Sequence, residues 1–539
     1  MIGASRKFAL ALALGCCAAV GAAQSIPPSG DAAWASERDR KRAAVFEARE
    51  ADWRIGAVVY QVIVDRFAPP ENLEAKRALY PEPKKLRAWS ETPTRGTRLE
   101  SVKVESHELD FWGGDLQSLR TKLSYIHDLG VDVLYLNPIQ LAYTNHKYDS
   151  QDYFKVSPEY GTREDVKALA ESLHGMNMKL VLDGVFNHMG RTSPHFQEAL
   201  ANPGSEYRNW YYIDPQFKKH GYRAWYDVAN LPEVNLENPE VRNQLFLGPD
   251  SVVQGYLRDG VDGWRLDVAF DIGFNYLSEL TQAAHKTKPG SLVVGEIWNY
   301  PEEWTPAVDG VMNFHARQII LNLVNEKISG EYAGRLFDQM VQDAGLEPIM
   351  RSWILLDNHD TKRLATEINE DWKRHMARTI QFTIPGSPNL YYGAELGMQG
   401  GDDPECRAPM RWDLANDNNP EFVWMKKLMH LRATNRALRV GDFRLLPSQR
   451  LLAFMRSTDH VAETVIVLAN PTNAEVKDLV GIRNSKLMNN VRMQDQFSDT
   501  QITIFAGLAD VTVPAHTILV LKPLIAQEGL EYTPYKRVQ

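Results

Sequence analysis

The stretch "LVVGEIWNY", residues 292–300, is an apolar run that ends in a carboxylate, Glu296, with Trp298 close behind it. A short, continuous apolar run is typical of a parallel strand that is covered on both faces. Glutamate is depleted in strands and is rarely buried without a partner. The stretch therefore predicts a buried strand that carries a carboxylate at its end, and this carboxylate needs a partner or a chemical role.

Similar apolar runs recur from about Gly56 onward, with helical segments between most of them. Eight runs predict strands: "AVVYQVIVDRF" (57–67), "VDVLYLNP" (131–138), "KLVLDGVFNH" (179–188), "VDGWRLDVA" (261–269), "SLVVGEIW" (291–298), "DGVMNF" (309–314), "SWILLDNHD" (352–360) and "NLYYGAE" (389–395). Eight strand–helix units predict an α/β fold, a (β/α)8 TIM barrel, in preference to the competing doubly wound open sheet.

Two of the predicted helices have recognisable ends. Leucine and isoleucine recur at helical spacing over residues 116–126, and Gly130 is a suitable C-cap for that segment. A second amphipathic segment begins after Thr162, a suitable N-cap, and stops at Gly175.

The change of pattern along the chain predicts its domain organisation. Short alternating strands such as "TVIVLAN" (464–470) and "DVTVPAHTILVLKP" (510–523) replace the strand–helix units after the last barrel helix. We expect a barrel over residues 56–188 and 236–440, an inserted subdomain after the third strand at 189–235, a C-terminal antiparallel β-sandwich at 441–525 and a tail at 526–539. Residues 24–55 form a partly helical N-terminal segment.

The first residues have the pattern of a secretory signal peptide. Arg6 and Lys7 precede an apolar segment, and small residues follow it. We expect residues 1–23 to be removed near Ala23, which places the protein in the periplasm or outside the cell. A lipid anchor on Cys16 is the less favoured alternative, because "ALGC" (13–16) has alanine three places before the cysteine, where lipoprotein signals prefer leucine. Cleavage would leave Cys406 as the last of the three cysteines, without a partner for a disulfide.

Composition excludes several classes of protein. Hydrophobic residues make up 44% of the 539 residues and charged residues 24%, as in ordinary soluble globular proteins. The net charge of −9 argues against a nucleic-acid partner, which would require a basic surface. No stable membrane span is expected after the signal segment, and the sequence leaves the oligomeric state open.

Polar residues cluster where the predicted strands end, which is where a TIM barrel places its active site. Arg265 and Asp267 are two residues apart and therefore point to the same face of an extended strand. Adjacent strands lie about 4.8 Å apart, so Asp267 and Glu296 can lie about 5 Å from each other. That is the separation of the two carboxylates in a retaining glycosidase.

These strand ends also carry a family resemblance. "DGVFNH" (183–188), "GWRLDVA" (263–269), "GEIW" (295–298) and "LLDNHD" (355–360), in this order, resemble the four conserved segments of the α-amylase family of glycoside hydrolases (family 13). "NHKYDSQDY" (145–153) and "YYGAELGMQGGDDPECRAPMRWD" (391–413) resemble further segments, especially those of its neopullulanase and cyclomaltodextrinase branch.

The resemblance implies a role for each matching residue. Asp267 would be the nucleophile, Glu296 the general acid/base and Asp360 the third carboxylate. The implied substrate-binding residues are His146, Tyr148, His188, Arg265, His359, Asp403 and Arg407. The implied reaction is hydrolysis of α-1,4-glucosidic bonds in maltodextrins, cyclodextrins or starch-type glucans through a covalent glycosyl-enzyme intermediate, so the expected partner is an α-glucan oligosaccharide.

No cofactor is expected to be required, and the sequence leaves a metal open. Relatives often bind calcium through a loop after the first strand. Here that loop offers Glu71 and Asn72, and Asp115 follows in "WGGD", but the dense set of oxygen ligands that calcium prefers is missing. The segment "LPEVN" (231–235) also departs from the "MPKLN" common in the branch, with Glu233 in place of lysine.

Other functions agree less well with the sequence. A metal-dependent barrel hydrolase would usually carry a His-x-His pair on an early strand, and "VVYQVIVDRF" (58–67) has none. Non-catalytic relatives that serve as heavy chains of amino-acid transporters would have lost the catalytic acids. A transglycosylase of the same family, amylosucrase-like or trehalose-synthase-like, and an endo-acting α-amylase remain open, because acceptor choice depends on the shape of the acceptor site.

Overall fold

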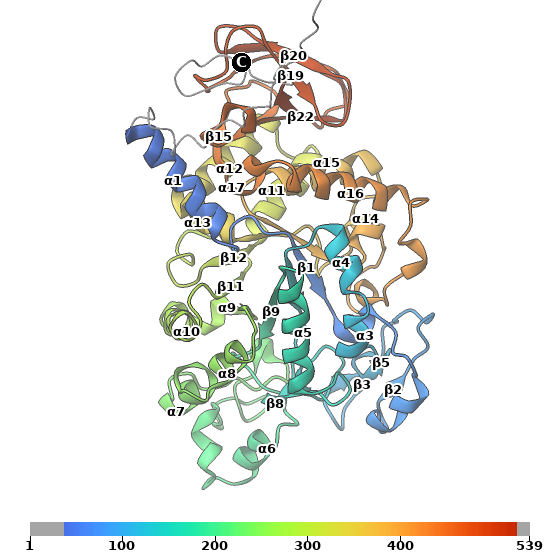
Figure 1. The fold of residues 1–539 in the computed structure, drawn as a ribbon. Helices are drawn as coiled ribbons and strands as arrows, with labels where there is room; N and C mark the ends of the chain where they lie inside the picture. The colour runs from blue at the N-terminus through green and yellow to red at the C-terminus, as the bar shows by residue number, and fades with distance from the viewer. Residues whose placement is uncertain (1–36, 525–539) are drawn as a thin grey trace, which may run out of the picture.

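The computed structural model describes residues 37–524, and in it eight parallel strands close into a barrel (Figure 1). Neighbours around the barrel are neighbours in the chain: β1 (Val59–Val62), β6 (Val133–Leu136), β9 (Lys179–Gly184), β10 (Gly263–Leu266), β11 (Leu292–Ile297), β12 (Gly310–Asn313), β13 (Trp353–Ile354) and β14 (Ser387–Tyr391), which pairs back with β1. The predicted TIM barrel is confirmed, and the open sheet is excluded.

Helices surround the barrel on the outside. They are α3 (Leu116–Arg120), α4 (Leu123–Leu129), α5 (Arg163–Gly175), α8 (Val252–Arg258), α10 (Phe274–Thr287), α11 (Phe314–Val324), α12 (Gly330–Ala344), α13 (Leu346–Arg351), α15 (Asp371–Thr383), α16 (Pro420–Ala433) and α17 (Arg436–Val440). Shorter turns of helix lie at α2 (Val64–Phe67), α7 (Pro239–Arg242), α9 (Ala269–Ile272) and α14 (Leu364–Glu367). Gly130 caps α4 in a left-handed conformation, and the side chain of Thr162 caps α5, as predicted.

Two local predictions were wrong. The apolar run 57–67 forms a strand only over β1, and its last residues turn into α2, where Asp65 accepts backbone hydrogen bonds from Trp112 and Gly113. The single helix expected over 116–126 is broken into α3 and α4 at residues 121–122. In both places tertiary contacts override a continuous apolar pattern, because the spacing of apolar residues alone does not reveal a change of chain direction.

Alternation along the strands separates the barrel interior from the layer beneath the helices. The interior is closed by large apolar side chains: Val59, Val133, Tyr135, Val181, Leu292, Val294, Met312 and Trp353. Residues between them in sequence, such as Leu134 and Leu182, pack against the helices instead. The same alternation continues to the carboxyl ends of the strands. It places Asp183, Arg265 and Glu296 in the last inward layer of the barrel, fully or almost fully buried.

The loops at the carboxyl ends build the walls of the barrel mouth. The segment after β1 contains the two-stranded pairs β2 (Lys85–Leu86) with β5 (Asp110–Phe111) and β3 (Arg98–Leu99) with β4 (Val104–Glu105). β7 (Gln140–Ala142) pairs with β8 (Ser150–Val156), and the insertion after β9 carries α6 (Pro194–Ala201). Figure 1 shows these parts together at the lower end of the molecule.

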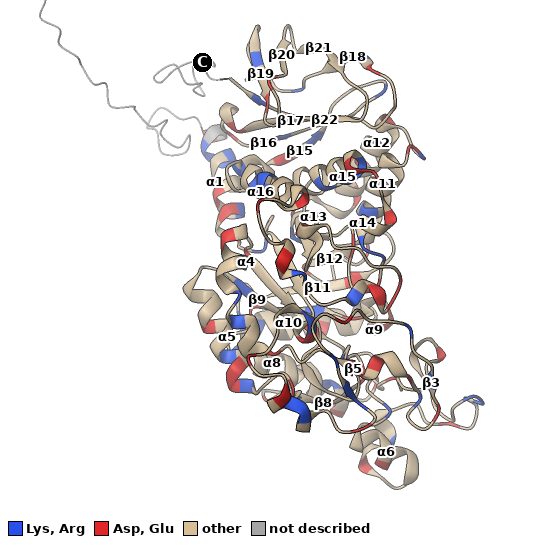
Figure 2. Ribbon diagram, turned by 90° about the vertical axis from the view of Figure 1, so that its right-hand side faces the viewer, with Lys and Arg blue, Asp and Glu red and all other residues tan. Residues whose placement is uncertain are grey.

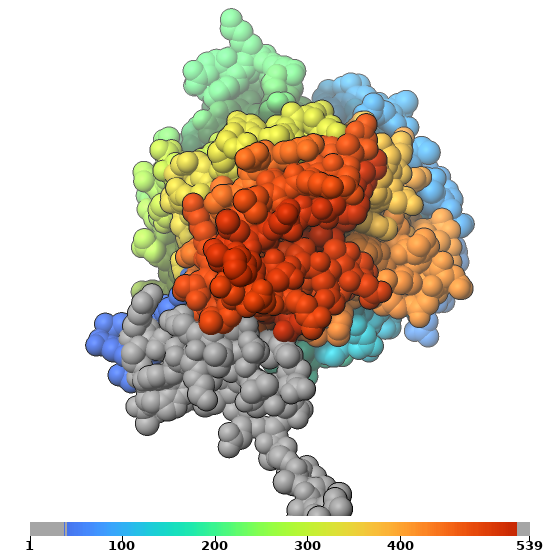
Figure 3. Space-filling view, turned by 90° about the horizontal axis from the view of Figure 1, so that it is seen from above, coloured from blue at the N-terminus to red at the C-terminus, as the bar shows by residue number. Residues whose placement is uncertain are grey.

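The C-terminal strands form two antiparallel sheets at the other end (Figure 1). The larger sheet contains β15 (Asp442–Leu445), β16 (Leu452–Ser457), β17 (Thr464–Asn470), β22 (Thr517–Pro523), β19 (Val491–Asp495) and β20 (Gln501–Ile504). The smaller one pairs β18 (Val476–Gly481) with β21 (Leu508–Val513). Seen from above, these strands cover the middle of the barrel end (Figure 3).

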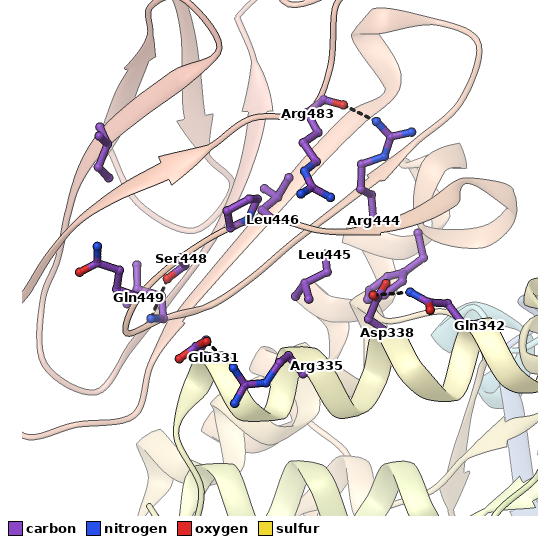
Figure 4. Close-up of a pocket in the computed structure, with 14 residues that line it drawn as sticks. Glu331, Arg335, Asp338, Gln342, Arg444, Leu445, Leu446, Ser448, Gln449 and Arg483 are labelled. Carbon is purple, nitrogen blue, oxygen red and sulfur yellow. Dashed lines mark hydrogen bonds and ion pairs between the residues drawn. The ribbon is translucent and has the colours of Figure 1, made fainter.

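The larger sheet is buried on both faces at its centre, which explains the continuous apolar run of β17. Val465 and Val467 pack in the same cluster as α11, α12 and α15 of the barrel, whereas Ile466 and Leu468 pack toward the smaller sheet. A groove of about 560 Å³ remains between α12 and the chain around β15 (Figure 4). Polar groups on its walls are paired locally, for example Gln342 with Asp338 and Arg444 with the carbonyl of Arg483.

The N-terminal helix α1 (Glu37–Ala51) packs on the same end of the barrel. Arg49 of α1 pairs with Glu347 and Asp442 and donates to the carbonyl of Val440. The predicted signal peptide, the alternative lipid site at Cys16 and the tail at 526–539 lie outside the described residues. Between residues 37 and 524 no helix is long and apolar enough to cross a membrane. In the view of Figure 2 acidic and basic residues are interspersed along the ribbon.

The junction between barrel and C-terminal sheet supplies a stability prediction. Arg456 on β16 is fully buried and donates to the carbonyls of Thr383 at the end of α15 and of Gly441. Arg456→Ala leaves both carbonyls buried without donors, so we expect a loss of about 2–4 kcal/mol and a lower Tm in calorimetry. Arg444→Ala on the neighbouring β15 is the control, because that side chain is exposed and should change stability by less than about 0.5 kcal/mol. Equal Tm values for the two variants would contradict the prediction.

Candidate active site

A cleft of about 560 Å³ opens at the carboxyl ends of the barrel strands. Nine of the ten residues predicted from the sequence line it: His146, Tyr148, His188, Asp267, Glu296, His359, Asp360, Asp403 and Arg407. The tenth, Arg265, lies fully buried and pairs with the carboxylates of Asp267 and Glu296. The predicted residues therefore converge on one site, although they come from strand ends and loops more than 250 residues apart.

Arg265 holds three carboxylates from three adjacent strands. Its NH1 donates to both oxygens of Asp183 on β9, at 2.8 and 3.0 Å, and to Oδ1 of Asp267 at 3.0 Å. Its NH2 forms an ion pair with Oε2 of Glu296 on β11 at 2.9 Å. One cation therefore faces three acids within one buried layer.

Asp267 points into the cleft from the end of β10. Burial raises the pKa of its carboxyl well above the usual range, and the nearby acids Glu296, Asp183 and Asp360 add to this effect, while Arg265 opposes it. The following residue, Val268, has a left-handed backbone conformation with φ of 40°. A β-branched residue is strained in that region, and the strain lies directly beside the predicted nucleophile.

Glu296 is held by a different set of donors. Its Oε2 accepts the backbone N–H of Val268 at 2.9 Å, and its Oε1 accepts the indole N–H of Trp298 at 3.0 Å. Trp298 is also stacked on Phe314, with ring centroids 3.8 Å apart, yet half of it remains exposed. The carboxylate at the end of the apolar run 292–300 therefore has partners on both oxygens and still faces the cleft.

Tyr148 and His359 form a stacked pair on the opposite wall. Their rings are nearly parallel, with centroids 5.3 Å apart, and the Tyr148 hydroxyl lies 2.7 Å from Nε2 of His359. This hydroxyl donates to Asp183, so it accepts from Nε2–H of His359, whose Nδ1 accepts from the amide of Gln61. Burial and the charge of Arg407 lower the pKa of His359 well below its usual value. His359 is therefore neutral, with its proton on Nε2.

Asp360 is the least enclosed of the three predicted catalytic acids. Its side chain is about one-third exposed, and its Oδ1 lies 3.3 Å from NH2 of Arg407. NH1 of Arg407 pairs with Asp403 at 3.1 Å, and Nε donates to the carbonyl of His359. The Arg407 guanidinium therefore joins the loop after β14 to the loop after β13 at one end of the cleft.

Two histidines complete that part of the cleft. Nε2 of His146 lies 3.5 Å from the Glu108 carboxylate. His188 is buried, its Nε2 lies 3.8 Å from Asp267, and burial together with His146 lowers its pKa to about 3. Nε2 of His188 has no hydrogen-bond partner within the described chain, and the residue lines the cleft.

Sequence analysis missed several residues of the site. One of them is Asp183, which connects Arg265 with Tyr148 and Tyr135. Its position on the inward face of β9 was the sequence feature that could have identified it as a residue of the site. Trp225 and Tyr226 come from the insertion, and Phe270 follows the nucleophile strand; all three line the cleft. Nothing in their local sequence shows that the insertion folds back over the barrel.

The described residues hold no group of three or more histidine, cysteine, aspartate or glutamate side chains arranged to bind a metal ion. The loop where relatives often bind calcium was the expected place for one. There the carboxylate of Asp115 and the carbonyl of Gly113 both accept hydrogen bonds from the ammonium group of Lys76, at 2.8 and 2.7 Å. The oxygen atoms present therefore fit a lysine and do not fit a calcium ion.

Comparison with known proteins agrees with this architecture. Residues 61–440 match the family described as the α-amylase catalytic domain. A cyclomaltodextrinase from Geobacillus thermopakistaniensis is 34% identical over 471 residues, covering 83% of this chain and 74% of that protein. Neopullulanase 2 from Thermoactinomyces vulgaris is 31% identical over 461 residues, covering 80% and 74%.

Among solved structures, the ligand-free cyclic α-maltosyl-(1→6)-maltose hydrolase from Arthrobacter globiformis superposes with a TM-score of 0.72. It is 27% identical and covers 87% of this chain and 100% of its own. The family match spans most of the chain, and the relatives named above share about a third of their residues with it. The chain therefore belongs to the α-amylase family and is a glycoside hydrolase of the cyclomaltodextrinase and neopullulanase type.

Proposed function

We propose that this enzyme hydrolyses α-1,4-glucosidic bonds of short and cyclic maltodextrins with retention of the anomeric configuration. The observation that carries the proposal is the shared guanidinium of Arg265. Asp267 and Glu296 bind its two terminal nitrogens, at 3.0 and 2.9 Å, so their carboxyl groups lie close together. A close pair leaves no room for a water between acid and sugar, as an inverting enzyme with carboxyls roughly 6.5–9.5 Å apart would need.

The proposed roles of the three acids are those that the family resemblance implies. Asp267 attacks the anomeric carbon to form a glycosyl-enzyme ester, while Glu296 donates its proton to the leaving oxygen. Glu296 then takes a proton from the water that cleaves the ester, and Asp267 leaves as a carboxylate. Asp360, fixed by Arg407, accepts hydrogen bonds from hydroxyls of the attacked ring, and neutral His359 offers a ring nitrogen beside it.

One end of the cleft suits a chain end. The stacked rings of Tyr148 and His359 form a platform for the attacked sugar. The Arg407–Asp403 and Glu108–His146 pairs line the same cleft with charged groups. Long, charged side chains across the path of a glucan favour a short non-reducing end over the interior of a polymer.

The other end offers exposed aromatic surface. Tyr226, Trp298 and Phe270 line the cleft on the Glu296 side, and Tyr226 is 87% exposed. Exposed aromatic rings bind the apolar faces of sugars, so this end suits the leaving-group sugar. The same surface can hold a second sugar as acceptor, which makes transglycosylation through the same intermediate the second candidate activity.

The mechanism predicts that Asp267→Asn abolishes nearly all hydrolysis and does not lower stability. The folded pKa of Asp267 is raised, so the folded state binds this proton more tightly than the unfolded chain. Its ionisation therefore costs stability that begins as pH rises through the unfolded pKa and becomes complete only above the folded pKa. We expect a higher Tm for Asp267→Asn, measured by scanning calorimetry beside activity on maltotriose.

Asp183→Asn is the matched control, because Asp183 accepts hydrogen bonds from Tyr135, Tyr148 and Arg265. Its Tm should fall. Glu296→Gln should also lose nearly all turnover. Substantial activity of Asp267→Asn would contradict the assignment of the nucleophile.

The substrate proposal predicts a higher kcat/KM for β-cyclodextrin and maltotriose than for soluble starch, with maltose and glucose as main products. The motivation is the similarity to cyclomaltodextrinases together with the charged pairs that line one end of the cleft. Steady-state kinetics and early product sizes test it. Rapid loss of starch viscosity with long products and no ring opening would identify an endo-acting α-amylase instead. Products longer than the substrate would indicate transglycosylation.

We also propose that the enzyme acts in the periplasm or outside the cell. The support is the basic, apolar and small-residue order of residues 1–23. Mass spectrometry of protein purified from a native-like host should find an N-terminus near Gln24. An intact Met1, or a lipid on Cys16, would show that the processing prediction is wrong.

A further inference from the structure

The segment 145–149, "NHKYD", divides its side chains between the cleft and the scaffold. His146 and Tyr148 line the cleft. The residues between and around them point the other way: Asn145 donates to the carbonyls of His107 and Asp110. This alternation means that the position of the sugar platform depends on what holds the buried side chains.

Lys147 is the central buried residue of this segment. Its side chain is completely buried and pairs with the carboxylate of Glu159, which is also buried. The ammonium lies over the rings of Phe111 and Tyr160, 5.1 and 5.0 Å from their centroids. The backbone of Lys147 is left-handed, with φ of 66°. A residue other than glycine or asparagine keeps that conformation only when its surroundings require it.

Two further lysines surround the same acid. Nζ of Lys76 donates to the carbonyl of Glu159 at 2.8 Å, besides its bonds to Asp115 and Gly113. Nζ of Lys84 lies 3.8 Å from the Glu159 carboxylate. Both side chains are mostly buried, about 13% and 12% exposed. Although burial works against it, Lys147 and Lys84 keep the pKa of Glu159 below its usual value. We call Lys76, Lys84, Lys147, Asp115 and Glu159 the lysine cluster.

The geometry of the lysine cluster suits ammonium groups and excludes a divalent cation. Lys76 has three acceptors at 2.7–2.8 Å, which match the three N–H donors of a lysine. Calcium takes six to eight oxygens at roughly 2.3–2.6 Å. A divalent ion beside Glu159 would also face the charges of Lys84 and Lys147, and at such short distances inside a protein this repulsion is large.

We infer that the lysine cluster is a built-in cation site that fixes the sugar platform without a metal ion, and that Lys147 is a positioning residue for His146 and Tyr148. Lys76 ties the segment after β1 to the start of α3. Glu159 carries that connection to Lys147, and Lys147 sets the backbone from which His146 and Tyr148 project. The part that concerns the platform rests on the proposed function, whereas the metal-free cation site does not.

The metal arm of the test uses the full-length enzyme and needs no substrate. Thermal unfolding is measured after treatment with EDTA and after addition of calcium, and the metal content is measured by mass spectrometry. We expect the same Tm in all conditions and less than one equivalent of calcium. We expect Lys76→Met to lower Tm, and calcium not to restore it. A Tm that falls with EDTA and recovers with calcium in the unmodified enzyme would overturn the inference.

The positioning arm compares Lys147→Met, Lys147→Arg and, as a matched control, Lys155→Met, whose side chain is 70% exposed and pairs only with Asp152 at the surface. Lys147→Met should lower kcat/KM on maltotriose by roughly 10–100-fold, mainly through KM, because His146 and Tyr148 bind the sugar without exchanging protons. Lys147→Arg keeps the charge and should recover part of this loss. Lys155→Met should behave as the unmodified enzyme.

Lys84→Met provides a milder variant if Lys147→Met does not fold, and its KM should rise in the same direction by a smaller factor. Lower Tm with unchanged KM in both Lys147→Arg and Lys84→Met would show that the cluster has only a structural role, and would overturn the positioning claim. If the unmodified enzyme does not act on maltodextrins, the proposed function fails, while the calcium and Tm measurements still decide the cation site.

Discussion

The guanidinium of Arg265 is the interaction on which the active site depends. It is fully buried in the barrel layer nearest the carboxyl ends of the strands, and its partners Asp183, Asp267 and Glu296 come from β9, β10 and β11. Burying a charge is costly unless it is paired and hydrogen-bonded. The strands must therefore keep the register in which all three acids reach the cation, so the spacing of the two catalytic carboxylates is a consequence of satisfying one buried arginine.

The surroundings maintain local strain beside these acids. Val268 and Tyr226, like Lys147, have left-handed backbones, with φ of 40° and 49° for the first two, and both border the cleft. Strained residues of this kind persist when the packing around them is extensive. Val268 is 5% exposed, and the closed barrel with its helices provides that packing; Tyr226 is 87% exposed and lies outside it. The stability of the scaffold thus offsets the repulsion among the acids of the cleft and the unfavourable backbone conformation beside them.

The two ends of the cleft differ in physical character. In the proposed function, this difference decides which end binds the attacked sugar and which binds the leaving group. Ion pairs and neutral histidines surround the platform formed by Tyr148 and His359, where hydroxyl groups need donors and acceptors in fixed places. Exposed rings dominate the other end, where Tyr226 from the insertion faces solvent. In the proposed function, directional hydrogen bonds bind the attacked ring, while the aromatic surface binds the leaving group. The lysine cluster lies behind the first end, where positional accuracy matters most.

The sequence alone determined the barrel, which follows from local periodicity, and it identified most of the site through the strand ends together with the family resemblance. Continuous apolar runs identify parallel strands, and polar residues at their ends, such as Asp267, Glu296 and His359, must meet at one face once the strands close. Only the tertiary structure decided the rest. Asp183 joins the site because inward residues of adjacent strands share a layer, Trp225 and Tyr226 join because the insertion folds back, and Lys76 meets Glu159 through contacts between segments distant in the chain. No local pattern records such pairs, since each depends on how separate elements pack.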